Sequence, residues 1–122
     1  MGTKPNVVIF NAFQEDATNG VEVTPGTWRY TKVLTDRLQI NFTAKRSGSV
    51  TPVHTHPGEF VSLIIRGRYR DCVDDQVYEL GPGDVLYLPE GGSHGPIEVL
   101  GDELGVRIDI LSPPRGEETT LS

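Results

Sequence analysis

Short runs in which apolar and polar residues alternate are the dominant pattern of this chain. The clearest run spans residues 37–46, with Leu38, Ile40, Phe42 and Ala44 on one side and Gln39, Asn41, Thr43 and Lys45 on the other. Successive side chains of a β-strand point to opposite faces, so this period of two predicts a strand. No window of about 12 residues combines apolar positions at helical spacing with the absence of Gly and Pro. The chain is therefore expected to be all-β.

Similar runs recur along the chain, and 14 Gly and 9 Pro provide turns between them. We expect strands at residues 6–10, 27–36, 37–46, 59–67, 68–73, 76–80, 85–89, 96–100 and 104–111. Residues 11–20 have the composition of a polar linker, and residues 113–122 that of a loose tail. About nine to eleven short strands without a helix predict a β-sandwich or barrel. The length of 122 residues fits a single domain.

Composition and charge narrow the classes of function. The net charge is −6 and no basic stripe occurs, so no nucleic-acid partner is expected. The longest purely apolar run has four residues, 7–10, which predicts neither a membrane span nor a secretion signal. Cys72 is the single cysteine, so an internal disulfide is excluded and a reducing cytoplasm is the expected location. We interpret Cys72 as a small strand residue, because no histidine is free to activate it as a nucleophile.

The chain has three histidines, and their spacing suggests a metal site. His54 and His56 are two residues apart, so on a strand they share one face at a separation of about 6–7 Å. His94 follows in a Gly-rich turn and would have to approach them from another strand. Three His ligands that leave a position open form a catalytic type of metal site. In the alternative interpretation, each histidine is an ordinary surface or hydrogen-bonded residue.

Two motifs around the histidines resemble those of the cupin superfamily. In the first motif, Gly48 and five further residues precede His54-Thr55-His56. The second motif runs over residues 83–94 as Gly, five residues, Pro, one residue, Gly, two residues and His94. The resemblance covers about residues 35–110 and implies a double-stranded β-helix, or jelly-roll barrel, with one metal ion inside its mouth. Residues 1–122 would then be one cupin domain, with N-terminal strands in 6–34 and a tail at 113–122.

The chain departs from the cupin pattern at the carboxylate ligand. Counting back from Gly67 places that ligand position at Phe60, while the carboxylate stands at Glu59. Strand parity agrees, because His54, His56 and Phe60 share a face if the strand stays regular. A bulge at residues 57–58 would instead rotate Glu59 inward. The expected ligand set is His54, His56 and His94, with Glu59 as the alternative fourth ligand.

The absence of a carboxylate at position 60 affects which metal ion and which reaction are expected. A set of two histidines and one carboxylate is typical of non-haem Fe(II) oxygenases. A cupin site with three histidines resembles that of acetylacetone-cleaving and cysteine-dioxygenase-like enzymes, which implies one divalent ion, Fe(II). Zinc, nickel, copper and manganese stay open as alternatives.

Further pocket candidates follow from the same strand parity. The residues in phase with Phe60, together with polar residues on neighbouring strands, are Ser62, Ile64, Arg66, Tyr87, Gln39 and Asn41. For Arg66 the alternative is a surface position at a strand end, and for Tyr87 it is packing. Trp28 and Tyr30 are expected in the core or in a dimer contact. By analogy with small cupins, residues 7–10 are expected to exchange with a second subunit in a homodimer.

Three functions compete. Apolar walls at Phe60 and Ile64 favour an Fe(II) dioxygenase that acts on a small chelating substrate, such as a β-diketone or a related ketone. A metal-dependent isomerase or lyase acting on a sugar acid is the alternative, but it needs a base and a polar lining that the first motif does not supply. Residues 60–71 also resemble the ligand-sensing cupin half of arabinose-type regulators, which would make the protein a non-enzymatic sensor, although this chain shows no helix-turn-helix segment.

Overall fold

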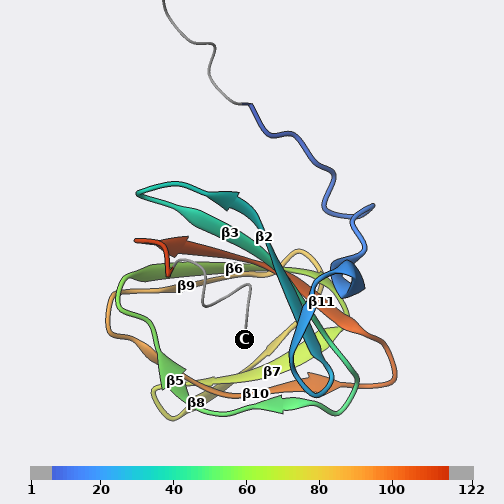
Figure 1. The fold of residues 1–122 in the computed structure, drawn as a ribbon. Helices are drawn as coiled ribbons and strands as arrows, with labels where there is room; N and C mark the ends of the chain where they lie inside the picture. The colour runs from blue at the N-terminus through green and yellow to red at the C-terminus, as the bar shows by residue number, and fades with distance from the viewer. Residues whose placement is uncertain (1–6, 116–122) are drawn as a thin grey trace, which may run out of the picture.

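The computed structural model describes residues 7–115, and strands account for nearly all of its regular structure (Figure 1). A 3₁₀ turn, η1 (Ala17–Asn19), precedes the strands. The strands are β1 (Val21–Thr24), β2 (Thr27–Leu34), β3 (Gln39–Lys45), β4 (Val50–Thr51), β5 (His54–Thr55), β6 (Glu59–Arg66), β7 (Arg68–Val73), β8 (Gln76–Leu80), β9 (Val85–Leu88), β10 (Ser93–Leu100) and β11 (Gly105–Ser112). Within residues 7–115, no helix is long and apolar enough to cross a membrane.

The strands form two antiparallel sheets that face each other (Figure 1). One sheet has the order β1-β2-β3-β11-β6-β9, and the other has the order β4-β10-β7-β8 with β5 also paired to β10. Strands close in space are thus often far apart in sequence, as when β11 lies between β3 and β6. This arrangement confirms the predicted all-β, double-stranded β-helix.

The N-terminal part differs from the prediction. Residues 7–10 form no strand, and residue 6 lies outside the described part. Their side chains are largely exposed, with Ile9 90% exposed, and within residues 7–115 no neighbouring strand offers them backbone partners. The first strand is instead β1, which pairs with β2 through a turn at Gly26 whose φ is +81°. The tail predicted at residues 113–122 lies outside the described residues from 116 onward.

Strand β3 is buried on both faces, which decides where the core and the site lie. Its apolar residues Phe42 and Ala44 belong to a cluster on the outer face of the sheet, and the ring of Tyr30 stacks on Phe42 with centroids 5.4 Å apart. The polar residues of β3 are equally buried and face the space between the sheets: Gln39, Asn41, Thr43 and Lys45. The barrel interior therefore has a polar wall.

A β-bulge in β6 changes which of its residues point inward. Ile64 of β6 pairs with Arg107 of β11, but the next pair joins Arg66 to Val106, so Ile65 is the extra residue. Because directly paired residues share a face, Arg66 lies on the outer face with Val106 and is exposed. Arg66 is therefore not a pocket residue, and its alternative interpretation, a surface position at a strand end, is confirmed.

Candidate metal centre

The three histidines converge at one point between the sheets. His54 lies on β5 directly opposite His94 on β10, and His56 follows β5 immediately. Each ring offers one ligand atom, and these atoms all lie within 4.8 Å of one another. His56 and His94 are buried, and His54 is half-buried. His94 lies on a strand, not in the turn expected from its Gly-rich surroundings.

A glycine next to His94 allows this convergence. Gly95 has a φ of +117°, and a Cβ atom built there would lie 2.7 Å from the Cα of Val53 and 2.9 Å from the carbonyl oxygen of Pro52. Only glycine can therefore adopt this conformation and let β10 approach the segment that precedes His54 so closely. On the other side, the backbone N–H of Gly91 donates to the carbonyl oxygen of His56 at 3.2 Å. The backbone thus positions the rings independently of any side-chain contact between them.

Burial keeps the imidazoles in the neutral form that metal binding requires. Desolvation, followed by the charge of His54, lowers the pKa of His56 to about 4. The same two causes and the charge of His56 lower the pKa of His94 to about 3. The Nδ1 atom of His54 lies 3.0 Å from the carbonyl oxygen of Pro52 and donates to it, so Nε2 of this ring is left as a ligand.

The donor set fits one divalent ion. The Nε2 atoms of His56 and His94 are 3.0 Å apart. Two imidazole nitrogens bound to one ion at ~2.1 Å and at a right angle would be ~3.0 Å apart. The Nδ1 atoms of both rings are buried and have no hydrogen-bond partner within residues 7–115, whereas the two Nε2 atoms face each other, so Nε2 is the atom that each ring would offer to the ion. His54, His56 and His94 would hold the ion, and the geometry does not identify the element.

Glu59 lies on the outer surface, while Phe60 lies beside the histidines. The Phe60 ring stacks on His56 with centroids 4.3 Å apart and an interplanar angle of 7°. Glu59 is exposed and accepts a hydrogen bond of 2.6 Å from the hydroxyl of Tyr87. Tyr87 pairs with Val61 on this outer face and is 55% exposed, so its predicted place in the pocket is wrong. No bulge turns Glu59 inward.

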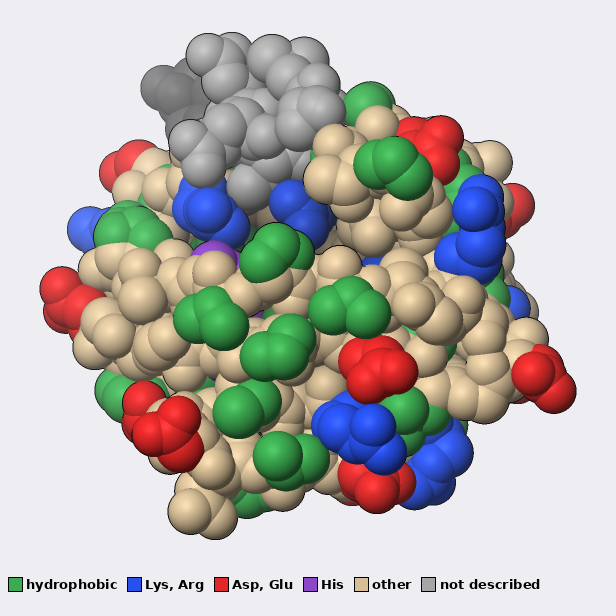
Figure 2. All heavy atoms as spheres, turned by 90° about the horizontal axis from the view of Figure 1, so that it is seen from below, with side chains coloured by type: hydrophobic (Ala, Val, Ile, Leu, Met, Phe, Trp, Pro, Cys, Tyr) green, Lys and Arg blue, Asp and Glu red, His purple; other side chains and the backbone are tan. Residues whose placement is uncertain are grey.

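The pocket around the histidines is more polar than Phe60 and Ile64 suggested. It opens to solvent at its mouth and is lined by residues of both sheets. Its wall consists of Arg29, Asn41, Thr43, Lys45, Thr51, Phe60, Ile97, Arg107, Asp109, Leu111 and Arg115, besides the histidines. Figure 2 shows basic side chains next to a small exposed patch of histidine on one face of the molecule.

Three predicted pocket residues lie behind this wall and not in it. Ile64 is buried in an apolar cluster with Tyr69. Gln39 donates to the side-chain oxygen of Asn41 at 3.2 Å, and Ser62 belongs to the polar network below. Of the pocket candidates outside the histidines, only Phe60 and Asn41 are part of the wall.

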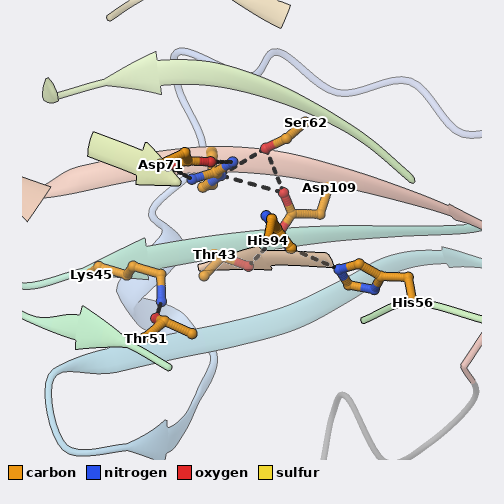
Figure 3. Close-up of polar contacts among 9 residues, drawn as sticks. Thr43, Lys45, Thr51, His56, Ser62, Asp71, His94 and Asp109 are labelled. Atoms are coloured by element: carbon orange, nitrogen blue, oxygen red, sulfur yellow. Dashed lines mark hydrogen bonds and ion pairs between the residues drawn. The ribbon is translucent and has the colours of Figure 1, made fainter. Parts of the chain in front are cut away.

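A buried ion-pair network holds the only carboxylate in the described wall of the pocket (Figure 3). Arg107 is 2% exposed and pairs with Asp71 through both terminal nitrogens, at 3.2 and 3.4 Å. Its Nε lies 3.6 Å from Asp109 and donates to the hydroxyl of Ser62 at 2.7 Å. Asp109 accepts from Ser62 at 2.7 Å and from Thr43 at 3.2 Å. The carboxylate of Asp109 is thereby fixed in orientation.

Sequence reasoning missed the charged residues of the wall, although signals for them exist. Lys45 continues the polar face of β3 that includes Asn41. Arg107 and Asp109 alternate with the apolar residues of β11, which is unusual in a strand with neighbours on both sides. Charged residues that alternate with apolar residues along β11 could have identified Arg107 and Asp109 as pocket candidates.

Similarity to known structures agrees with the fold. KdgF from Halomonas sp. is 25% identical over 79% of this chain and 88% of that chain, with a TM-score of 0.73. An RmlC-like cupin from Shewanella frigidimarina is 26% identical over 76% of this chain and 81% of that chain, with a TM-score of 0.68. An RmlC-like cupin with a double-stranded β-helix from Methanocaldococcus jannaschii, 19% identical over 92% and 94% of the two chains, shares the fold (TM-score 0.69).

Comparison of the sequence with family models identifies one family for this chain. No curated protein sequence matches the chain. The family model for the cupin domain matches residues 42–111, which contain both histidine motifs and all three histidines. Since this match covers more than half of the chain, the protein belongs to the cupin family.

Proposed function

We propose that this cupin is a metal-dependent enzyme that converts a small, oxygen-rich substrate by non-redox isomerase or lyase chemistry. The supporting observation is the oriented carboxylate of Asp109 in the same pocket wall as His54, His56 and His94. An isomerase or lyase needs a group that takes a proton from the substrate. The inward positions of the first motif contain no such group, whereas Asp109 of β11 brings a carboxylate into the pocket wall.

The roles of the residues follow from their contacts. The histidines would hold one divalent ion, which supplies Lewis acidity towards substrate oxygens. Asp109 would accept the proton. Ser62 and Thr43 donate hydrogen bonds to its carboxylate and Arg107 lies beside it, so the carboxylate is held in one orientation. No second carboxylic acid in the described wall shares a proton with it. Asn41 accepts hydrogen bonds from Gln39 and Thr31 through its oxygen, so its NH₂ group remains to donate to a substrate hydroxyl or carbonyl.

An Fe(II) dioxygenase that acts on a β-diketone or a related ketone is the second candidate. It is supported by the resemblance of the three-histidine set to that of acetylacetone-cleaving enzymes and by the apolar side of the pocket formed by Phe60, Ile97 and Leu111. Such an enzyme consumes oxygen together with its substrate, whereas the proposed isomerase or lyase turns over without it. A ligand-sensing cupin would bind its ligand without turnover.

The test combines metal analysis with an anaerobic assay. Protein purified without added metal is analysed for bound ions, and a panel of sugar acids, keto acids and β-diketones is then assayed with and without oxygen. The proposal expects about one ion per chain, a His94→Ala variant without bound metal, and turnover that is independent of oxygen and lost in Asp109→Asn. Glu59→Gln is the control, because this carboxylate lies outside the pocket and its loss should change neither readout. Oxygen uptake that matches substrate loss would support the dioxygenase instead, and a wild-type protein unable to bind metal would refute both.

A further inference from the structure

The pocket wall has more positively than negatively charged side chains. Four cationic side chains line the pocket, namely Arg29, Lys45, Arg107 and Arg115, whereas Asp109 is the only carboxylate in its described wall. A charge removed from water is costly unless it is paired. The positions of Arg107, Lys45 and Arg29 relative to the carboxylates therefore show which part of the wall is suited to bind an anion from outside.

Arg107 is already paired. Its guanidinium contacts Asp71 through two nitrogens and also lies beside Asp109 and over the ring of Tyr69, 4.6 Å from the ring centroid. Three of its five N–H donors are used, by Ser62 and Asp71, and Tyr69 covers one face of the group. Arg107 therefore orients Asp109, and its charge is already balanced by carboxylates of the protein.

Lys45 is buried without a counter-ion. Its residue is 4% exposed, and within residues 7–115 the ammonium group donates to the hydroxyl of Thr51 and to no carboxylate. Figure 3 shows this pair apart from the network that joins Asp71 to Asp109. Desolvation, followed by repulsion from Arg107 and Arg29, lowers the pKa of Lys45 to about 8. The ammonium is thus still mostly protonated at neutral pH, with two of its three hydrogens left for other acceptors.

Arg29 lies next to Lys45 and, like Lys45, forms no ion pair with a carboxylate within residues 7–115. It is directly opposite Thr43 on the neighbouring strand, and Lys45 is two residues further along, so the two cations are diagonal neighbours on the inner face. Arg29 is half-buried, and no carboxylate in residues 7–115 forms an ion pair with it. Two adjacent cations repel each other unless an anion lies between them.

We propose that Arg29 and Lys45 form a subsite for a substrate carboxylate, next to the three histidines. The planar guanidinium of Arg29 can bind both oxygens of a carboxylate, while the ammonium of Lys45 binds one as a point charge. A carboxylate at this subsite balances the two cations. The inference deepens the proposed function, on which it rests for the reacting end of the substrate: the substrate class becomes a small organic acid, not a neutral diketone.

Anion binding to metal-free protein tests the subsite separately from the metal site. In calorimetric titrations with acetate, malonate and inorganic phosphate, we expect malonate to bind wild-type protein more tightly than phosphate does. Arg29→Met and Lys45→Met should each weaken malonate binding about 10- to 100-fold, the loss of one charge-assisted hydrogen bond. Arg46→Met is the matched control, since Arg46 follows Lys45 in sequence but is exposed and lies over Trp28.

A second titration, with Zn²⁺, shows that the variants are folded and separates the two proposals. Arg29→Met and Lys45→Met should bind Zn²⁺ as the wild type does, while His94→Ala should lose Zn²⁺ and keep malonate. Equal malonate affinity in wild type and in both pocket variants would overturn the subsite, even if metal binding and turnover are found. Phosphate binding that exceeds malonate binding about tenfold, and that needs the same two residues, would also overturn it in favour of a phosphoryl ligand.

Discussion

Replacing Lys45 by methionine should remove a pH-dependent cost from the folded protein. The ammonium of Lys45 faces Arg29 from β2, Arg107 and Asp109 from β11, and Asp71 from β7. Desolvation and the two arginines outweigh the two aspartates, so the pKa falls from 10.5 to about 8 in the folded chain. Methionine is similar in length and carries no charge, so the variant loses this cost while it keeps most of the packing.

The magnitude follows from the two pKa values. The drop from 10.5 to about 8 corresponds to about 3 kcal/mol of unfolding free energy when it is fully expressed. Below pH 8 both the folded and the unfolded chain hold the proton, and the folded state carries the whole cost. Between pH 8 and 10.5 the folded lysine loses its proton while the unfolded one keeps it, so wild-type stability rises with pH. From pH 7 to 9.5 this rise is ~2 kcal/mol, and Lys45→Met should lack it.

Urea unfolding at intervals between pH 7 and 9.5, in the presence of a chelator, measures this difference. Other titrating groups contribute equally to wild type and variant, so subtraction of the two profiles isolates Lys45. Arg46→Met should retain the wild-type rise, because Arg46 is exposed. Parallel profiles for wild type and Lys45→Met would refute the reasoning: the ammonium would then be solvated in the folded protein, and the argument for an anion subsite would lose its main support.

Three further predictions concern other parts of the molecule. Asp71→Asn should destabilise the protein by about 3 kcal/mol in urea unfolding, because it leaves the buried guanidinium of Arg107 without its main partner, and a loss below about 1 kcal/mol would contradict this. Phe60→Glu should bind Zn²⁺ more tightly in calorimetry, since it adds a carboxylate where the ring contacts His56 and His94, and unchanged affinity would place position 60 beyond ligand reach. We also propose that residues 7–10, of which Val7 to Ile9 are exposed, pair with a second subunit: light scattering should show a dimer that Ile9→Asp converts to a monomer, and a wild-type monomer would refute it.

The strands and the two ligands nearest in sequence could be predicted because they depend on local periodicity. The alternation in residues 37–46 predicts β3 with an error of one or two residues, and the spacing of His54 and His56 places both side chains on one side of the pocket. Phe60 also lies where parity predicts it, beside His56, although residues 56–58 form no strand. Such patterns need only the neighbours along the chain, since the period of two persists as long as the strand is regular.

The errors have local and long-range causes. Parity fails at Arg66, because the extra residue Ile65 shifts the register with β11, and no Gly or Pro marks the bulge. The strand expected at residues 6–10 fails because the local pattern does not show whether a partner strand lies alongside. The alternation in β11 marks Arg107 and Asp109 as unusual, but it does not show that they reach the pocket, because the position of β11 between β3 and β6 depends on the order of strands in the sheet.

Alternation shows which residues share a face, but not which face lies inside the barrel. In β3 the ordinary expectation would put Phe42 and Ala44 in the interior, yet they pack on the outer face of the sheet beneath Ala17 and the residues that lead to it. That outer cluster provides apolar burial without occupying the space between the sheets. Part of the interior is thereby left to Lys45 and to the network around Asp109, beside the apolar clusters that contain Ile64 and Phe60, and these polar groups add binding chemistry at a cost in stability. A variant that fills the interior with apolar side chains should therefore be more stable and less able to bind its substrate, whereas a truncation in the outer cluster should lower stability while the bound metal stays in place.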